Sequence, residues 1–155
     1  MIGLLGEYEV TLDSKGRFLL PIAVKKQLGG EETNGFVINR GFEICLTLFP
    51  MKNWEKTVED ISDLSDYDVE ARQFRRYFLN GAVTVEFDGA GRLLLPKSLI
   101  EYAGLKKDVV LVCAFKKIEI WDKVKYQQLF DTLTPEAYSK LAQKVMAKKD
   151  DKLNG

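Results

Sequence analysis

The chain has 155 residues, the length of one ordinary domain, and its 46% hydrophobic and 30% charged residues predict a packed core and exclude intrinsic disorder. Lys and Arg together number 23, as do Asp and Glu, so the formal net charge is zero. This balance excludes a generally basic nucleic-acid coat protein, and any anion-binding surface must arise from local charge asymmetry or from assembly. The chain has no His, which removes most transition-metal sites and His-based acid–base catalysis.

The two cysteines, Cys45 and Cys113, lie in apolar, strand-like segments. This context predicts buried, reduced thiols in a cytosolic protein, and a disulfide or a redox pair is the alternative. Residues 1–6 contain no basic residue and only a short apolar run, so we expect no signal peptide. No stretch approaches the ~18 apolar residues of a membrane span, so we expect a cytoplasmic protein with no membrane partner.

An internal repeat organises the sequence. Residues 10–21 match residues 85–96 at an offset of 75, and seven of the twelve positions are identical: Val10, Asp13, Gly16, Arg17, Leu19, Leu20 and Pro21 in the first copy. At the same offset Gly29 matches Gly104, and with one residue of slip residues 42–44 align with residues 118–120. So many identities seldom arise by chance, and we infer a duplication.

The first copy is predicted to begin with two strands joined by a tight turn. Apolar and polar residues alternate over residues 8–12, as in a half-buried strand. The Asp–x–x–Gly–Arg motif that follows predicts the turn, because Asp13 can bond backbone two residues on and Gly16 tolerates a positive φ. Residues 18–20 form a short apolar strand that ends at Pro21, which has no N–H to donate.

The rest of the first copy is predicted to be a short helix over residues 23–28, which ends before a left-handed Gly29, and two strands over residues 35–39 and 44–48. The connecting segment is helical. Its first helix spans residues 51–61, and its second spans residues 68–79, with acidic residues at its start and arginines toward its end. The second copy repeats the first, with strands over residues 82–87, 93–95, 109–115 and 117–121 and a helix over residues 98–103.

After the second copy we expect a helix from Asp122 to about Leu133, and another that opens with Pro135 at its first position. The expected domain organisation is a first repeat at 6–54, connecting helices at 55–81, a second repeat at 82–125, C-terminal helices at 126–147 and a frayed tail at 148–155. Two β-units with the same pattern and unpaired strand edges are more stable joined than apart. We therefore expect one β-barrel made of two half-barrels around a single mixed core.

The repeated turn is the candidate functional feature. It places Lys15 and Arg17 of the first copy, and Arg92 of the second, at the tip or edge of a hairpin. An Arg there can bond a phosphate or the O6/N7 edge of guanine through two nitrogens. The alternative is structural: Asp13 pairs with Arg17, and Asp88 with Arg92, to stabilise each turn.

Other charged clusters have weaker functional interpretations. The pair Lys25–Lys26 could flank a phosphate or simply be solvated, whereas Lys106–Lys107 and Lys116–Lys117 are typical of edge protection. The arginines of residues 72–76 could line an anion groove, but their spacing favours ion pairs between subunits. Four aromatic residues fit core or interface anchors better than base-stacking platforms: Trp54, Phe74, Phe78 and Trp121.

The sequence does not favour an enzyme. Its carboxylates occur singly, and it contains no Gly-rich phosphate cradle and no Cys/His ligand set, so we expect no catalytic residue, no metal site and no cofactor. A dyad of Asp13 and Asp88 is conceivable, but turn formation explains both carboxylates more simply.

The chain resembles the MraZ family in several motifs: residues 13–17 followed by Pro21, residues 88–92 followed by Pro96, and residues 74–82, 102–105 and 118–122. The resemblance covers roughly residues 3–130. It implies an α+β, β-rich fold in which two tandem SpoVT-AbrB-type half-barrels fuse into one pseudo-symmetric, swapped-hairpin, double-psi-like β-barrel decorated by helices.

The same resemblance implies a function. MraZ proteins are bacterial transcriptional regulators that assemble into rings, associate with the nucleoid and act on the promoter of the cell-division and cell-wall gene cluster through short direct repeats. By this likeness we expect a nucleoid-associated repressor that binds double-stranded DNA through Lys15, Arg17 and Arg92 and has no small-molecule substrate. A ring-forming protein-interaction scaffold without specific DNA readout is the alternative.

Overall fold

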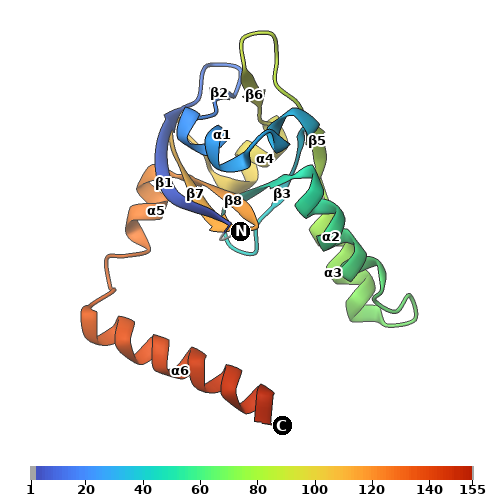
Figure 1. The fold of residues 1–155 in the computed structure, drawn as a ribbon, viewed down its shortest axis with the longest axis vertical. Coiled ribbons are helices and arrows are strands. Elements are labelled where there is room, and N and C mark those ends of the chain that lie inside the picture. The colour runs from blue at the N-terminus through green and yellow to red at the C-terminus, as the bar shows by residue number, and fades with distance from the viewer. Residues whose placement is uncertain (1–2, 155) are drawn as a thin grey trace. The chain divides into compact units, whose positions relative to one another are not determined.

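The computed structural model describes residues 3–154 and divides the chain into two compact units, residues 1–123 and residues 124–155. The first unit is α+β (Figure 1). Its antiparallel sheet has six strands, in the order β1 (Leu4–Thr11), β7 (Asp108–Phe115), β8 (Lys117–Asp122), β4 (Leu46–Pro50), β3 (Phe36–Arg40) and β5 (Val83–Val85). Strands β2 (Arg17–Leu19) and β6 (Arg92–Leu94) form a separate two-stranded antiparallel sheet.

Helices connect these strands in the predicted order. They are α1 (Ile22–Leu28), a 3-10 helix (Glu31–Asn34), α2 (Met51–Ser62), α3 (Val69–Leu79) and α4 (Lys97–Ala103). Helices α1 and α4 both end at a glycine in the left-handed conformation, with φ 60° and ψ 35° at Gly29 and at Gly104. The predicted glycine caps are therefore confirmed in both copies.

The two copies exchange their first strands. Strand β1 of the first copy pairs with β7 of the second, and β5 of the second copy pairs with β3 of the first. The registers are equivalent, since Val10 lies opposite Val109 and Val85 lies opposite Phe36. Strands β2 and β6 also pair across the copies, with Phe18 opposite Leu93 at the centre. The sequence repeat is thus a structural pseudo-twofold.

This symmetry corrects one part of the sequence alignment. In the β4–β8 pair, Leu46 lies opposite Ile120 and Leu48 lies opposite Ile118. The counterpart of residues 118–120 is therefore residues 46–48, not residues 42–44. The physical reason is the connection between strands, which takes residues 41–45 in the first copy and only residue 116 in the second. For the same reason β4 begins two residues later than predicted.

The predicted barrel does not close among the described residues. Strands β1 and β5 are the two edges of the six-stranded sheet, and β2 and β6 pair only with each other. The core, by contrast, is the expected single cluster, because both copies contribute fully buried side chains such as Phe18, Phe36, Leu93 and Leu111. Cys45 and Cys113 are buried and free, as predicted.

Around the second unit, two helices differ from the expectation. Helix α5 (Lys123–Gln128) ends before the predicted Leu133 and is followed by turns. Helix α6 (Pro135–Asn154) begins at the predicted proline, and its N-terminal turn is capped by Thr134, whose Oγ1 accepts from Ala137 N at 3.1 Å. It continues through residues 148–154, which we expected to be frayed, and the lysines and the leucine of this segment are good helix formers. No helix within residues 3–154 is long and apolar enough to span a membrane.

Candidate nucleic-acid interface

Two equivalent turns, loop 1 (residues 13–17) and loop 2 (residues 88–92), rise from one face of the first unit (Figure 1). In loop 1, Asp13 Oδ1 accepts from the backbone N–H groups of Lys15 and Arg17, both at 2.9 Å. Gly16 has φ 85°, and its N–H donates to Asp13 O at 3.0 Å. The predicted turn chemistry is confirmed.

Loop 2 repeats this geometry. Asp88 Oδ1 accepts from the N–H groups of Ala90 and Arg92, both at 2.9 Å, and Gly91 has φ 79°. These bonds have an electrostatic consequence. The N–H of Arg17, followed by its guanidinium, lowers the pKa of Asp13 to about 2, and the N–H of Arg92 lowers the pKa of Asp88 below its ordinary value. Both carboxylates therefore stay ionised at neutral pH.

Each turn carboxylate also holds an arginine. Arg17 Nε donates to Asp13 Oδ2 at 2.7 Å, and Arg92 Nε donates to Asp88 Oδ2 at 3.0 Å. Arg92 Nη1 lies 3.8 Å from Asp13 Oδ2, which links the two copies. The turn-stabilising ion pairs that we considered as the structural alternative are thus present. They engage mainly the Nε edge, and the side chains of Arg17 and Arg92 remain 26% and 33% exposed.

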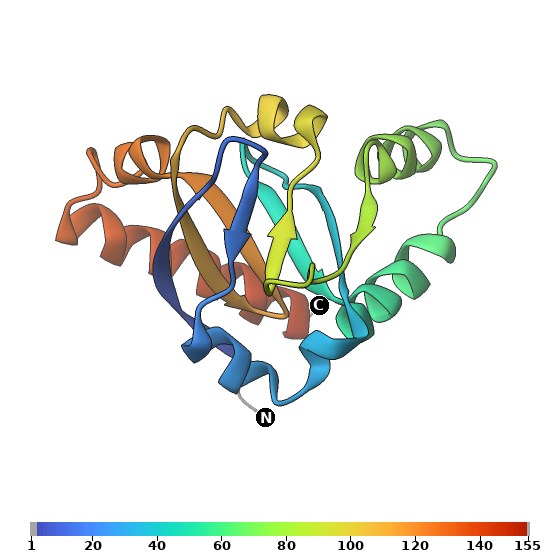
Figure 2. The same cartoon turned by 90° about the horizontal axis from the view of Figure 1, so that it is seen from above.

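The two arginines share an outward-facing surface with two leucines. Because successive strand residues point to opposite sides, Phe18 and Leu93 are buried and the residues that flank them face outward. Leu19 is 59% exposed and Leu94 51% exposed. We call this surface of β2 and β6, formed by Arg17, Leu19, Arg92 and Leu94, the ribbon face. Figure 2 shows the two strands side by side on the viewer's side of the first unit, with their loops at opposite ends.

The structure therefore places the three predicted residues in two settings. Arg17 and Arg92 lie diagonally on the ribbon face, since each is opposite a leucine of the other strand. Lys15 is exposed in loop 1 and has Ala90 as its counterpart in loop 2. The sequence did not single out Leu19 and Leu94. The available signal was that both copies carry leucine at this position, but a leucine that packs inside the fold explains that identity equally well.

Two of the three arginines of α3, Arg72 and Arg75, bond within the chain, and Arg76 is exposed. The expected contacts between subunits stay a prediction. Arg75 Nη2 lies 2.6 Å from Asp66 Oδ1, and Arg75 Nη1 donates to Leu64 O at 2.8 Å. Arg72 Nη1 donates to Asp66 O, also at 2.8 Å. These bonds fix the connection between α2 and α3, because Asp66 lies close enough in sequence for both arginines to reach it.

The aromatic residues of α2 and α3 pack together, as expected for core or interface anchors. The ring of Trp54 stacks on Phe78, with centroids 5.6 Å apart, and makes an edge contact with Phe49 at 5.4 Å. Within residues 3–154, no group of three or more Cys, Asp or Glu side chains could hold a metal ion.

The fold and its site define a class of protein: a duplicated, strand-exchanged α+β chain that carries an arginine-bearing turn from each copy on one face. The MraZ protein family model, described as antitoxin-like, matches this chain twice, over residues 4–77 and 78–148. The chain belongs to the MraZ family, which confirms the resemblance seen in the sequence.

Individual relatives match along nearly the whole chain. The chain is 42% identical over 151 residues to the transcriptional regulator MraZ of Christiangramia forsetii, which covers 97% of both chains. It is 40% identical to the protein of the same name from Flavobacterium psychrophilum, over 96% of this chain and 94% of the relative. The transcriptional regulator MraZ of Cytophaga hutchinsonii is 37% identical, over 92% of this chain and 93% of the relative.

Proposed function

We propose that this protein is a cytoplasmic, nucleoid-associated transcriptional regulator that binds double-stranded DNA through Lys15, Arg17 and Arg92. The observation that carries the proposal is the ribbon face, where two arginines held by carboxylates lie on an exposed two-stranded ribbon. The relatives are named transcriptional regulators, which supports the proposal.

The ribbon face has side chains suited to groove readout. The major groove of B-DNA admits a two-stranded β-ribbon, a guanine there offers O6 and N7 to an arginine, and a thymine offers its methyl group to an apolar side chain. The ion pairs with Asp13 and Asp88 use mainly Nε, so the Nη nitrogens of Arg17 can reach a base edge or a phosphate. In this role the two aspartates are positioning residues that limit the entropy lost by each arginine on binding.

The proposal includes the finer architecture. The exchange of β1 and β5 between the copies supports a swapped-hairpin arrangement of two SpoVT-AbrB-type half-barrels, within residues 6–54 and 82–125. The connecting helices then occupy residues 55–81, and the C-terminal helices begin near residue 126.

Assembly explains how a chain with zero net charge holds DNA. The ribbon face of one protomer offers few cations, whereas a ring repeats that face. Linked contacts of this kind raise avidity by ~10²–10⁴. A head-to-tail ring suits direct repeats rather than a palindrome, because its interfaces generate rotation. We therefore propose a ring that represses the cell-division and cell-wall gene cluster through direct repeats in its promoter.

The experiment is a titration of the full chain with a promoter-repeat duplex and a scrambled duplex at several salt concentrations. We expect a steep salt dependence and a preference for the repeat. Arg17→Ala should weaken binding by roughly 1–3 kcal/mol and reduce the preference, as should Arg92→Ala. Lys56→Ala removes one cation at an exposed position on α2; it is the control and should bind as the unmodified chain does.

Two outcomes would contradict the proposal. Binding that Arg17→Ala and Arg92→Ala together leave unchanged would overturn the assignment of the loops. A folded, assembled protein with neither salt dependence nor sequence preference would favour the scaffold alternative.

A further inference from the structure

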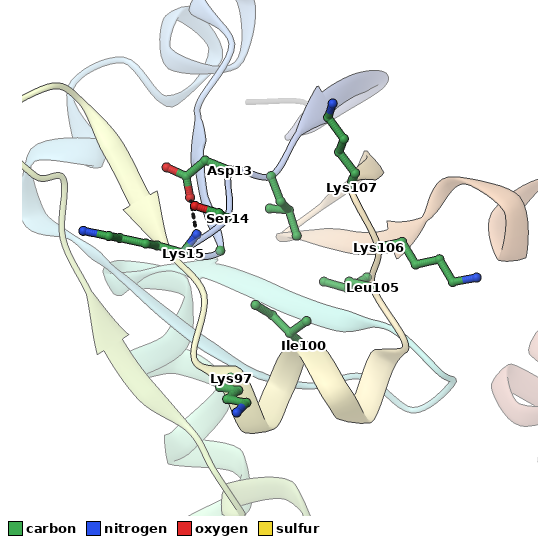
Figure 3. Close-up of a pocket in the computed structure, with 10 residues that line it drawn as sticks. Asp13, Ser14, Lys15, Lys97, Ile100, Leu105, Lys106 and Lys107 are labelled. Atoms are coloured by element: carbon green, nitrogen blue, oxygen red, sulfur yellow. Dashed lines mark hydrogen bonds between the residues drawn. The ribbon is translucent and has the colours of Figure 1, made fainter.

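A basic cavity lies beside loop 1, on the side where α4 packs. The cavity measures about 790 Å³ and is lined by four lysines: Lys15 of loop 1, Lys97 at the start of α4, and Lys106 and Lys107 in the connection to β7. Figure 3 shows these lysines around its rim, with Ile100 and Leu105 between them and with the four side chains pointing in different directions. Loop 1 forms one wall, because Gly16 packs closely against Ile100. We call this cavity the lysine pocket.

The charge of the lysine pocket is not neutralised from within. All four lysines are exposed, and none of them forms an ion pair with a described residue. Asp13, the one carboxylate that lines the pocket, has its oxygens engaged by loop 1 and its arginine. The nearby Asp122 accepts from the backbone N–H of Lys106 at 3.2 Å, and Asp108 follows Lys107 on β7. The pocket therefore carries an excess of positive charge.

The other copy lacks this feature. At the repeat offset, Lys106 and Lys107 correspond to Glu31 and Glu32, Lys97 corresponds to Ile22, and Lys15 corresponds to Ala90. One side of the pseudo-twofold thus carries four cations, whereas the equivalent positions on the other side carry two carboxylates and no cation. Lys25, the counterpart of Ile100, lies over the ring of Phe87 at 5.1 Å. The ribbon face is nearly symmetric, but its surroundings are not.

We propose that the lysine pocket receives a backbone phosphate of the duplex that the ribbon face contacts, and so fixes the direction in which each protomer lies on the DNA. The inference rests on the proposed function and deepens it. Lysine ammonium groups bind phosphates as point charges, and their flexible stems let several converge on one anion. Phosphate contacts set register and orientation without reading sequence.

Geometry favours a duplex as the source of the phosphate. The pocket shares residues 13–16 with loop 1, so a duplex that loop 1 contacts would lie next to the pocket. The phosphate lies on one side only, because the equivalent position in the second copy is acidic. Each protomer therefore binds its own repeat, which is an asymmetric sequence, in one orientation. A series of protomers in the same orientation matches a series of direct repeats.

The first test compares two triple variants with the same loss of charge. In K97Q/K106Q/K107Q the pocket loses three cations, and in the control K52Q/K56Q/K116Q the same number is lost from exposed positions outside loop 1 and α4. We expect the pocket variant alone to lower the salt slope, by about 0.9 for each lost contact. Its preference for the repeat duplex over the scrambled duplex should persist, because phosphate contacts carry no sequence information.

The second test locates the phosphate. A neutral methylphosphonate is placed at each backbone position of the repeat duplex in turn. We expect it to weaken binding at a phosphate on one side of each repeat, and we expect the pocket variant to be insensitive to that same substitution. Inorganic phosphate serves as a third probe, because a free anion is the other source of this chemistry.

The outcomes separate the inference from the proposed function. If Arg17→Ala weakens binding while the pocket variant matches the unmodified chain, the lysine pocket is not a DNA contact and the proposed function stands. Equal losses in both triple variants, or sensitivity to methylphosphonate on both sides, would also overturn the inference. Binding of inorganic phosphate at the pocket without any effect of methylphosphonate would assign it to a free anion. If the unmodified chain shows no DNA binding, both proposals fail.

Discussion

Replacing Gly16 by alanine should destabilise the protein more than the same change at its repeat counterpart, Gly91. Both glycines have positive φ, 85° and 79°, so each alanine incurs a similar backbone strain of about 1–2 kcal/mol. Only at Gly16 does the new Cβ meet a close neighbour, because it would lie 2.7 Å from Ile100 Cδ1. At Gly91 the nearest atom is Lys25 Nζ, at 3.9 Å. Overpacking of this kind costs a further 1–3 kcal/mol or so, and the lower end applies because Cδ1 is a flexible end.

Urea unfolding measures this difference. The fluorescence of Trp54 and Trp121 reports on the first unit, since both belong to it. Gly16→Ala should lower the urea midpoint further than Gly91→Ala at an unchanged slope. Ile100→Val removes Cδ1, so the penalty of Gly16→Ala should shrink in the Ile100→Val background. Equal midpoints for the two glycine variants, or a gap that Ile100→Val leaves intact, would refute the close approach of loop 1 to α4.

Three further predictions concern buried and charged groups. Burial raises the pKa of the Cys45 thiol to about 12, so this thiol ionises first in the unfolded state. The free energy of unfolding should therefore fall as the pH rises from about 9 to about 12. Urea unfolding of Cys45→Ala should lack that part of the fall. The pKa of Asp13 is about 2, so its stabilising contribution is present above the ordinary value of 3.8 and disappears as the pH falls through about 2; a carboxyl ¹³C NMR midpoint near 3.8 would contradict the bonds from Arg17. Thr47 Oγ1 donates to the buried Asn39 Oδ1, so Thr47→Val should cost about 1–3 kcal/mol in urea unfolding, and an unchanged midpoint would argue against that bond.

Local structure could be predicted from the sequence because it depends on neighbouring residues. The Asp–x–x–Gly–Arg turns, the glycine caps at Gly29 and Gly104, and the burial of both cysteines follow from side-chain chemistry within a few positions. The repeat also predicted a mixed core. These are the features in which propensity, turn chemistry and hydrophobic pattern agree.

Partners distant in the sequence could not be predicted in the same way. Alternation shows which side of a strand is buried, but it does not show that β1 pairs with β7 rather than within its own copy. The β4–β8 register depended on the length of a connection, which moved the counterpart of residues 118–120. The lysine pocket combines loop 1 of the first copy with α4 of the second, so no local pattern links Lys15 to Lys97. Asp66 pairs with Arg75 because the connection between α2 and α3 folds back on α3, and helical spacing does not predict that contact.

Contact between both loops and one duplex can be measured directly by photocrosslinking from the exposed loop positions Ser14 and Ala90, each replaced in turn by p-benzoylphenylalanine. The same replacement at Glu55, exposed on α2, is the control. We predict that Ser14 and Ala90 crosslink to the repeat duplex and that Glu55 does not. Folded variants that crosslink from neither loop, or from Glu55 as readily as from the loops, would contradict the account.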